Sequence, residues 1–394
     1  MRAGHGASEG DDTGRPRGGE VVKYIGSKRS LIPVILDAVA EAMGRIDGER
    51  TVIDLFSGTS RVGHALKRAG YRVLANDHNA YAEALARCYV QADAEDVLPD
   101  AERLVKEFNG LAGSPGYFTE TFCVRSRFIQ PRNGERIDAV REAIATKGLG
   151  PELEAVMLVS LMEAADRVDS TTGLQMAYLK DWSPRSGREL EMRLPEVLPR
   201  AAHGKGGAFG MDAQAAAAAL EGDIAYIDPP YNQHSYLGNY HMWESLVRWD
   251  KPEVFGIACK RVDCKARRSD FNSRVRCGGA MRRVLEATRP PVLIVSFSNE
   301  GYIGREEMEG MLAAVAGDGG TVTTIENDYK RYVGAQIGIF SPTGEKVGKV
   351  SHLRNKEYLY VVVKGEAAQR SAERATAGVA IGASGTSDPT PTAD

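Results

Sequence analysis

The sequence predicts an α/β protein with a doubly wound, mostly parallel sheet. Four short apolar runs have the length and composition of strands that are buried on both faces; they are residues 51–55, 72–76, 223–227 and 292–296. An amphipathic stretch lies between the first two runs, and Gly70 is expected to end it as a helix C-cap. A strand, a helix and a second strand in this order predict parallel pairing with a right-handed crossover.

The chain has 394 residues, enough for one large domain or two modest ones. Residues 1–20 and 366–394 are rich in small and polar residues, which predicts disordered tails. Between them we predict one part of the main domain at 21–99, a mainly helical insertion at 100–210 and a second part of the main domain at 211–365.

Two groups of apolar residues at helical spacing predict the insertion: Ile137, Val140 and Ile144, and then Leu153, Val156, Met157 and Leu161. The end of the fold has the alternating pattern of antiparallel strands. These strands are expected at 321–326, 329–340 and 357–363, with a turn at 341–346 between the last two.

Composition excludes several classes of protein. No apolar stretch approaches the roughly 20 residues of a membrane-spanning helix, and the N-terminus lacks the apolar core of a secretory signal. Five scattered cysteines without a CxxC pair predict reduced thiols in a cytoplasmic protein, and the absence of His/Cys partners at zinc spacing predicts no metal.

Charge is unevenly distributed along the chain. The formal net charge is −3, yet residues 260–283 hold nine Lys and Arg residues against Asp263 and Asp270. A block of this kind suits phosphate backbones, although many such blocks are only solvated surface, and both interpretations remain open.

The segment "DLFSGTSRVG" at 54–63 has the features of a ligand-binding turn. It places Asp54 on a strand and Gly58 in the turn before a helix, where backbone amides can approach a ligand. Asp77 ends the next strand, at a position where an acid often accepts hydrogen bonds from a ribose. The alternative is a tight turn in which Asp77 caps the following helix.

The same turn argues against a nicotinamide oxidoreductase, because it is not a GxGxxG turn and the charge of Asp54 would be unfavourable beside a pyrophosphate. That charge favours the cationic methionine moiety of S-adenosylmethionine. Upstream, Tyr24 and Lys28 precede an amphipathic stretch that Ser27 could cap, and they could contact a carboxylate and an adenine ring. A simple packing helix is an equally good interpretation of that stretch.

The segment "DPPY" at 228–231 follows the third apolar run. Neither proline can donate a ladder hydrogen bond, so the strand must end there. Because ligands bind at the carboxyl ends of strands in open α/β sheets, Asp228 is expected in the same crevice as Gly58 and Asp77.

Such a crevice could activate an exocyclic amine of adenine or cytosine, which is a poor nucleophile because its lone pair is delocalised into the ring. Asp228 and the Pro229 carbonyl could each accept one N–H, leaving the lone pair directed at a methyl donor. Tyr231 offers a flat face for a base taken out of the duplex. The alternative is a plain terminator of an edge strand.

Four motifs occur in a particular order: "KYIGSK" at 23–28, "DLFSGTSRVG", the acid of "LANDHN", and "IDPPYN" at 227–232. They resemble the motifs of Dam-type (alpha-group) DNA adenine-N6 methyltransferases, over about residues 22–364. The resemblance implies a Rossmann-like methyltransferase sheet and S-adenosylmethionine as co-substrate without a metal. It also implies methyl transfer to the exocyclic N6 amine of an adenine flipped out of a specific duplex DNA sequence.

The resemblance also assigns roles to residues. The implied catalytic residues are Asp228, Pro229 and Tyr231, and the implied donor-binding residues are Tyr24, Lys28, Asp54, Gly58, Asp77, Asp212 and Asp228. Residues 21–99 would bind the donor, 211–365 would carry catalysis, and 100–210 would recognise the target sequence.

Two further sets of residues have the chemistry for contacts with DNA. Those in the insertion that could read base edges or phosphates are Arg125, Arg127, Arg132 and Asn133. Those after "DPPY" of which two or three are expected to line the base pocket are His234, Tyr236, Asn239, Tyr240 and His241.

Several alternatives stay open. The acceptor could be the N4 amine of cytosine, and RNA or a protein side chain is a less favoured acceptor. The chain could also be a non-catalytic DNA-binding module that keeps the fold. We expect duplex DNA as partner, with a cognate restriction endonuclease that acts separately, no membrane association, and a monomer as the default state.

Overall fold

The computed structural model describes residues 28–176, 178–179, 181–330 and 354–365. Its centre is a seven-stranded sheet with the order β3-β2-β1-β4-β7-β9-β8. The first five strands in this order are parallel, and β9 runs antiparallel to both of its neighbours. The predicted α/β fold class is therefore confirmed. The strands are β1 (Thr51–Asp54), β2 (Arg72–Asn76), β3 (Gly207–Phe209), β4 (Ile224–Ile227), β7 (Val292–Ser298), β8 (Thr321–Lys330) and β9 (Arg354–Val363).

Each predicted apolar run forms a strand within about two residues of the expected bounds. All residues of β1, β4 and β7 are buried, because helices cover both faces of the sheet. Gly70 ends the helix between β1 and β2 with a φ of +93°, as expected of a glycine C-cap. Of the predicted antiparallel strands, 357–363 lies within β9 and 321–326 within β8, whereas 331–340 and the turn at 341–346 fall outside the described residues.

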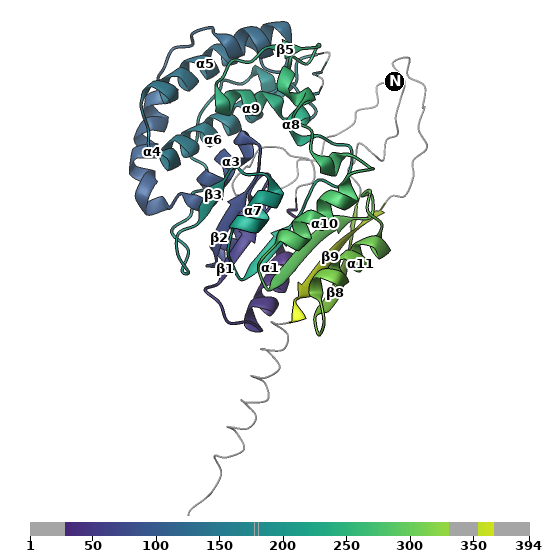
Figure 1. Cartoon of the computed structure of the whole chain (residues 1–394). Helices are drawn as coiled ribbons and strands as arrows, with labels where there is room; N and C mark the ends of the chain where they lie inside the picture. Colours follow the sequence, from purple (N-terminus) through teal and green to yellow (C-terminus); the bar gives the residue numbers. More distant parts are fainter. Residues whose placement is uncertain (1–27, 177, 180, 331–353, 366–394) are drawn as a thin grey trace, which may run out of the picture.

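Alternate residues of the strands enter two separate hydrophobic cores. Ile53, Ala225 and Leu293 pack against one group of helices, while Val52 and Ile224 pack against another. This alternation produces three layers, with the sheet in the middle (Figure 1). The first group is α7 (Ala213–Ala219), α10 (Cys277–Ala287) and α11 (Arg305–Ala316), and the second includes α1 (Ile32–Gly44) and α2 (Arg61–Arg68).

A mainly helical unit with its own core sits at one end of the sheet, drawn at the upper left in Figure 1. Ile137, Val140 and Ile144 are buried there, as their spacing predicted, and so are Val156, Met157 and Leu161. Leu153 is only partly buried. The unit contains α3 (Ala80–Ala86), η1 (Arg87–Gln91), α4 (Ala94–Asn109), η2 (Thr119–Arg125), α5 (Pro131–Thr146), α6 (Pro151–Arg167), α8 (Tyr236–Asn239) and α9 (His241–Arg248).

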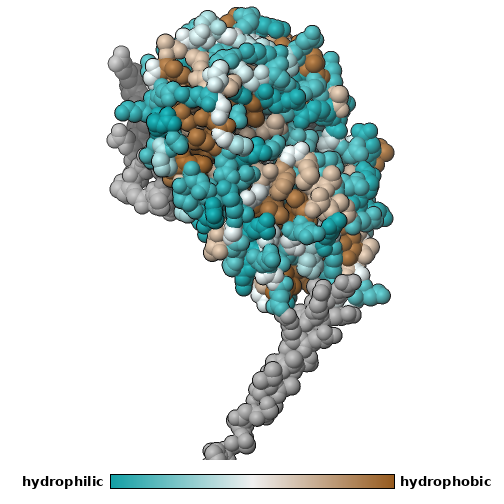
Figure 2. All heavy atoms as spheres, turned by 60° about the vertical axis from the view of Figure 1, so that its left-hand side comes forward, coloured by the Kyte–Doolittle hydropathy of each residue, from teal (hydrophilic) through white to brown (hydrophobic). Residues whose placement is uncertain are grey.

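The unit is thus assembled from the segment between β2 and β3 and from the segment that follows β4. The remaining small elements are η3 (Pro184–Gly187), β5 (Val254–Phe255), β6 (Lys260–Arg261), η4 (Val262–Lys265) and η5 (Asp270–Asn272), of which β5 and β6 form a two-stranded hairpin. On the face shown in Figure 2, hydrophobic residues form separate patches among mostly hydrophilic ones. None of the described helices is both long enough and apolar enough to span a bilayer.

Candidate active site

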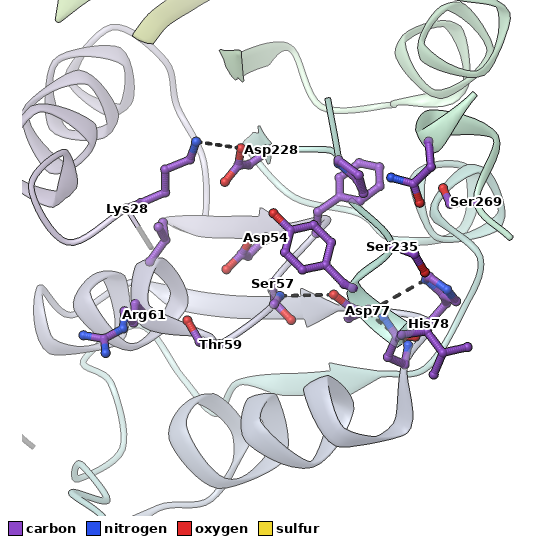
Figure 3. Close-up of a pocket in the computed structure, with 18 of the residues that line it drawn as sticks. Lys28, Asp54, Ser57, Thr59, Arg61, Asp77, His78, Asp228, Ser235 and Ser269 are labelled. Atoms are coloured by element: carbon purple, nitrogen blue, oxygen red, sulfur yellow. Dashed lines mark hydrogen bonds and ion pairs between the residues drawn. The ribbon is translucent and has the colours of Figure 1, made fainter. Parts of the chain in front are cut away.

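A pocket opens at the carboxyl ends of β1, β2 and β4, which is where ligands bind in sheets of this type. The hollow is open to solvent and has an empty volume of about 850 Å³, counting the solvent at its mouth. Asp54, Asp77, Asp228 and Lys28 all line it, so the structure brings together four residues that were predicted from separate motifs. Figure 3 shows Asp228 above Asp54 near the middle of the pocket, with Lys28 to their left and Asp77 to their right.

The turn between β1 and α2 forms one wall of this pocket. Gly58 has a φ of +51° and Ser60 one of +57°, so the chain passes twice through the left-handed region before the helix starts. The Gly58 amide donates to Asp77 Oδ2 at 3.1 Å, and the Asn79 amide donates to Asp77 Oδ1 at 3.0 Å. Asp77 therefore ties the turn to the start of α3 and also faces the pocket.

Asp54 is the last residue of β1 and is almost fully buried. Burial and the nearby charge of Asp228 raise its pKa to about 8, although the Gly63 amide and its partial positive charge oppose the shift. Within the described residues, neither carboxylate oxygen of Asp54 makes a hydrogen bond of ordinary geometry. Ser57 Oγ and Asn79 Oδ1 are also buried without a partner in that part of the chain, and both residues line the pocket. The pocket thus presents several acceptors that a polar ligand could satisfy.

Asp228 lies directly after β4 and has a lysine counter-ion. Lys28 Nζ is 3.0 Å from Asp228 Oδ1 and 2.5 Å from Glu357 Oε1. Burial alone would lower the pKa of Lys28, but the two carboxylates raise it well above its usual value. Burial raises the pKa of Asp228 to about 6, with Lys28 opposing the shift and Glu357 adding to it.

Aromatic rings and prolines surround Asp228. Pro229 is buried, and Pro230 and Tyr236 line the pocket. The Tyr231 ring is half-buried, with its centroid 6.0 Å from that of Phe297 and 5.7 Å from Lys28 Nζ. The acid and the ring of "DPPY" therefore both lie close to Lys28.

Some of the residues expected at the site lie elsewhere. Tyr24 and Ser27 are outside the described residues. Asp212 caps α7 by accepting from the Gln214 amide at 2.9 Å. It lines a neighbouring hollow that shares Phe56, His78, Arg267 and Ser269 with the pocket, so its predicted contact with the donor adenine remains a prediction.

Of the five residues after "DPPY" that could line a base pocket, only Tyr236 lines the pocket of the described structure. His234 is exposed, whereas Asn239, Tyr240 and His241 are buried. His241 Nε2 lies 2.8 Å from the Gln175 carbonyl, so this histidine packs inside the helical unit.

The residues proposed to contact DNA in the insertion differ in their surroundings. Asn133 is buried, donating to the Arg188 carbonyl at 2.9 Å and accepting from the Leu190 amide at 3.0 Å, which is a structural role. Arg132 donates to the Gly187 carbonyl, and Arg127 lies over the Trp182 ring at 4.8 Å. Arg125 is exposed at the end of η2.

The basic segment 260–283 is partly neutralised by ion pairs. Arg261 is buried between Asp250 and Asp263, and Arg276 and Arg283 both pair with Asp270. These arginines stabilise the segment, so fewer of its cations face solvent without a counter-charge than the sequence suggested.

Sequence reasoning missed other residues of the site. Glu357 and Ser296 come from β9 and β7, and Ser296 Oγ lies 2.8 Å from Glu357 Oε1. Arg267, Ser269 and Asn272 reach the pocket from the segment after the β5–β6 hairpin. Basic composition is the one sequence feature that marks this segment, and no motif predicts that these side chains reach the pocket.

Comparison with known proteins identifies relatives of this chain. The modification methylase StsI of Streptococcus sanguinis is 29% identical over 79% of this chain, and the type II methyltransferase M.FokI of Planomicrobium okeanokoites is 29% identical over 74%. These matches cover 49% and 46% of the relatives, so the chain spans about half of their length. The type II methyltransferase M.NlaIII of Neisseria lactamica is 25% identical, over 87% of this chain and 99% of its own length.

A protein-family match extends over most of the described fold. Residues 24–276 match the family described as D12 class N6 adenine-specific DNA methyltransferases. The matched region includes the turn after β1, the acid after β2 and the "DPPY" segment after β4, which are the parts of the chain that build the pocket. The chain therefore belongs to the D12 class of N6 adenine-specific DNA methyltransferases.

Proposed function

We propose that this chain transfers a methyl group from S-adenosylmethionine to the N6 amine of an adenine in duplex DNA. The observation that carries the proposal is the position of Asp228, which faces the same pocket as Asp54 and Asp77. A donor held by the turn after β1 and an amine held by "DPPY" would then meet in one place, as group transfer requires.

The chain's own residues suit the donor. Asp77, at the end of β2, would accept from the ribose of the donor, and the positive φ of Gly58 would let the backbone approach it closely. Asp54, Ser57 and Asn79 offer buried acceptors to the donor's cationic groups. Bound S-adenosylmethionine would supply the electrophilic methyl group.

Asp228 would hold and orient the acceptor. Its carboxylate can accept one N–H of the target amine and the Pro229 carbonyl can accept the other, so that the nitrogen lone pair is free for the methyl group. Tyr231 would stack on the flipped adenine, a contact worth roughly 1–3 kcal/mol per base. With a pKa of about 6, Asp228 can also take the proton that the amine loses.

We further propose duplex DNA as the partner, with a separately acting restriction endonuclease, a cytoplasmic location and a monomeric state. The modification methylases among the relatives support the pairing with a nuclease. We propose that the segments that read the target sequence lie mainly in 100–210. In this region Arg125 is exposed, and Arg127 lies over the Trp182 ring.

Expression in a host that lacks DNA methylation, followed by sequencing that detects modified bases, tests this function. We expect N6-methyladenine within one short motif. Asp228→Ala should lose at least about a hundredfold in activity, because a positioned hydrogen-bond acceptor of the transition state is removed. A matched control is Glu221→Ala, which removes an exposed acid that pairs with Arg289 away from the pocket. N4-methylcytosine instead of N6-methyladenine, or no modified base at all, would contradict the proposal.

A further inference from the structure

Lys28 is the single described cation within ion-pair distance of Asp228, and it is shared with a second acid. Glu357 is buried and lies on β9, the antiparallel strand beside β7. Its oxygen Oε1 contacts both Lys28 Nζ and Ser296 Oγ. An acid more than a hundred residues beyond "DPPY" therefore helps to hold the counter-ion of Asp228.

The ion pair occupies one oxygen of the carboxylate that the proposed reaction needs as an acceptor. Asp228 Oδ1 is engaged by Lys28 at 3.0 Å, while a target amine also needs an acceptor on this carboxylate. An ammonium group has three N–H donors and moves on a flexible stem, so it can keep its contact with one carboxylate while it leaves another. Glu357 is placed to receive it.

We propose that Glu357 is a positioning residue for methyl transfer, acting through Lys28 to keep Asp228 in place and to draw the lysine away when the target amine binds. This inference rests on the proposed function. Its physical basis is that a buried charge left without a partner is costly, so Lys28 can release Asp228 only if another anion stays beside it.

Titratable groups on the neighbouring elements interact electrostatically with Asp228. Asp228 faces Lys28 and Glu357, and its charge also acts on Asp54 of β1, Tyr226 of β4 and Tyr236 of α8. Of these groups, Glu357 is the one whose removal would lower the pKa of Asp228 without disturbing the pocket lining.

The test is Glu357→Gln, which keeps the shape and removes the charge. Lys28 would then pair with Asp228 alone, so we expect kcat to fall about tenfold while KM for DNA and the donor Kd change less than about twofold. The low-pH limb of the kcat profile should move to lower pH, because the negative charge of Glu357 raises the pKa of Asp228.

Glu326→Gln is the matched control. Glu326 lies on the adjacent strand β8, is exposed, and pairs with Arg305 and Lys356, so its variant should keep wild-type kinetics. If Glu357→Gln does not fold, Ser296→Ala removes the hydroxyl that donates to Glu357 and also interacts with Tyr226, and it should give a smaller loss of kcat in the same direction. An unchanged kcat and pH limb in the folded variant, or a loss of thermal stability with an unmoved limb, would overturn the proposal.

Carboxylate NMR titration gives a readout that does not depend on activity. With ¹³C-labelled aspartate, the Asp228 signal is assigned by its absence in Asp228→Asn, and its pKa should be lower in Glu357→Gln than in the wild type. An inactive wild type with this pKa change would refute the proposed function but keep the electrostatic link. An active wild type with no change in the Asp228 pKa would refute the link alone.

Discussion

Asp54 shares the pocket with Asp77, Asp228 and Lys28, and burial together with a neighbouring charge determines its protonation. Burial and the charge of Asp228 raise the pKa of Asp54 to about 8, so Asp54 carries a proton near neutral pH in the protein without ligand. A cationic ligand would favour the ionised form, since an opposite charge at close range stabilises a carboxylate. Binding of the donor should therefore be linked to release of a proton.

This linkage gives a prediction about Asp54. Donor binding at pH 7 should release close to one proton from the Asp54 carboxyl in the wild type, and Asp54→Asn should remove this release and weaken binding. Isothermal titration in two buffers of different ionisation enthalpy measures the number of protons. Affinity in the wild type should rise as pH increases toward 8, because the folded pKa of Asp54 is about 8 and ionisation then costs less. Equal proton release in both proteins would contradict the assignment of Asp54.

At the scale of single elements, the sequence predicted the strands well. Asp54, Asp77 and Asp228 could be placed at strand ends because uninterrupted apolar runs mark strands that are buried on both faces. The suggested helix cap at Ser27 was wrong. Helix α1 begins at Ile32 with Leu31 in the N-cap position, after a turn in which the Leu31 amide donates to the Lys28 carbonyl at 2.8 Å.

Contacts that depend on tertiary structure could not be predicted in this way. Glu357 lies 329 residues from Lys28, and only the order β4-β7-β9 brings the two together. The burial of Asn133 depends on how the chain returns past α5 near Leu190. No local sequence pattern encodes either contact. Residue type alone could therefore suggest what Asn133 can bind, but it could not predict where Asn133 or Glu357 lies.

Alanine substitutions at two glycines should change the free energy of unfolding in opposite directions. Gly310 lies inside α11 on an exposed surface, and an added Cβ would meet nothing within 4 Å. Gly310→Ala should therefore raise the free energy of unfolding by about 0.5–1 kcal/mol, because alanine restricts the unfolded chain more. Gly206 precedes β3, where a Cβ would lie 2.6 Å from the Val90 carbonyl oxygen and 2.9 Å from that of Val73. Gly206→Ala should cost about 1–3 kcal/mol, since backbone atoms would have to move.

Denaturant unfolding of the two alanine variants beside the wild type measures both changes. The midpoint should move to higher denaturant for Gly310→Ala and to lower denaturant for Gly206→Ala, with similar slopes. A stabilised Gly206→Ala would show that the loop before β3 relaxes more easily than its close packing implies.

At the scale of the whole molecule, the helical unit and the sheet meet around the pocket. Arg267 makes this connection: Nη1 pairs with Glu244 of α9 at 2.8 Å, and Nη2 donates to the His78 carbonyl just after β2 at 3.2 Å. The segment around it also carries cations toward solvent. With a net charge of −3, the protein can attract DNA only through such local clusters.

Arg268 and Arg274 are expected to contact DNA phosphates. Both are exposed, lie near the pocket residues Arg267 and Asn272, and have no ion-pair partner among the residues that the structure describes. Each alanine variant should weaken binding to all DNA sequences alike and reduce the slope of log Kd against log salt concentration by about one. Arg289→Ala is the control, because this exposed arginine precedes β7, at the amino ends of the parallel strands and so opposite the pocket, and it pairs with Glu221. Fluorescence anisotropy at several salt concentrations measures the slopes, and a change in Arg289→Ala equal to that in Arg268→Ala would place the DNA on a different face.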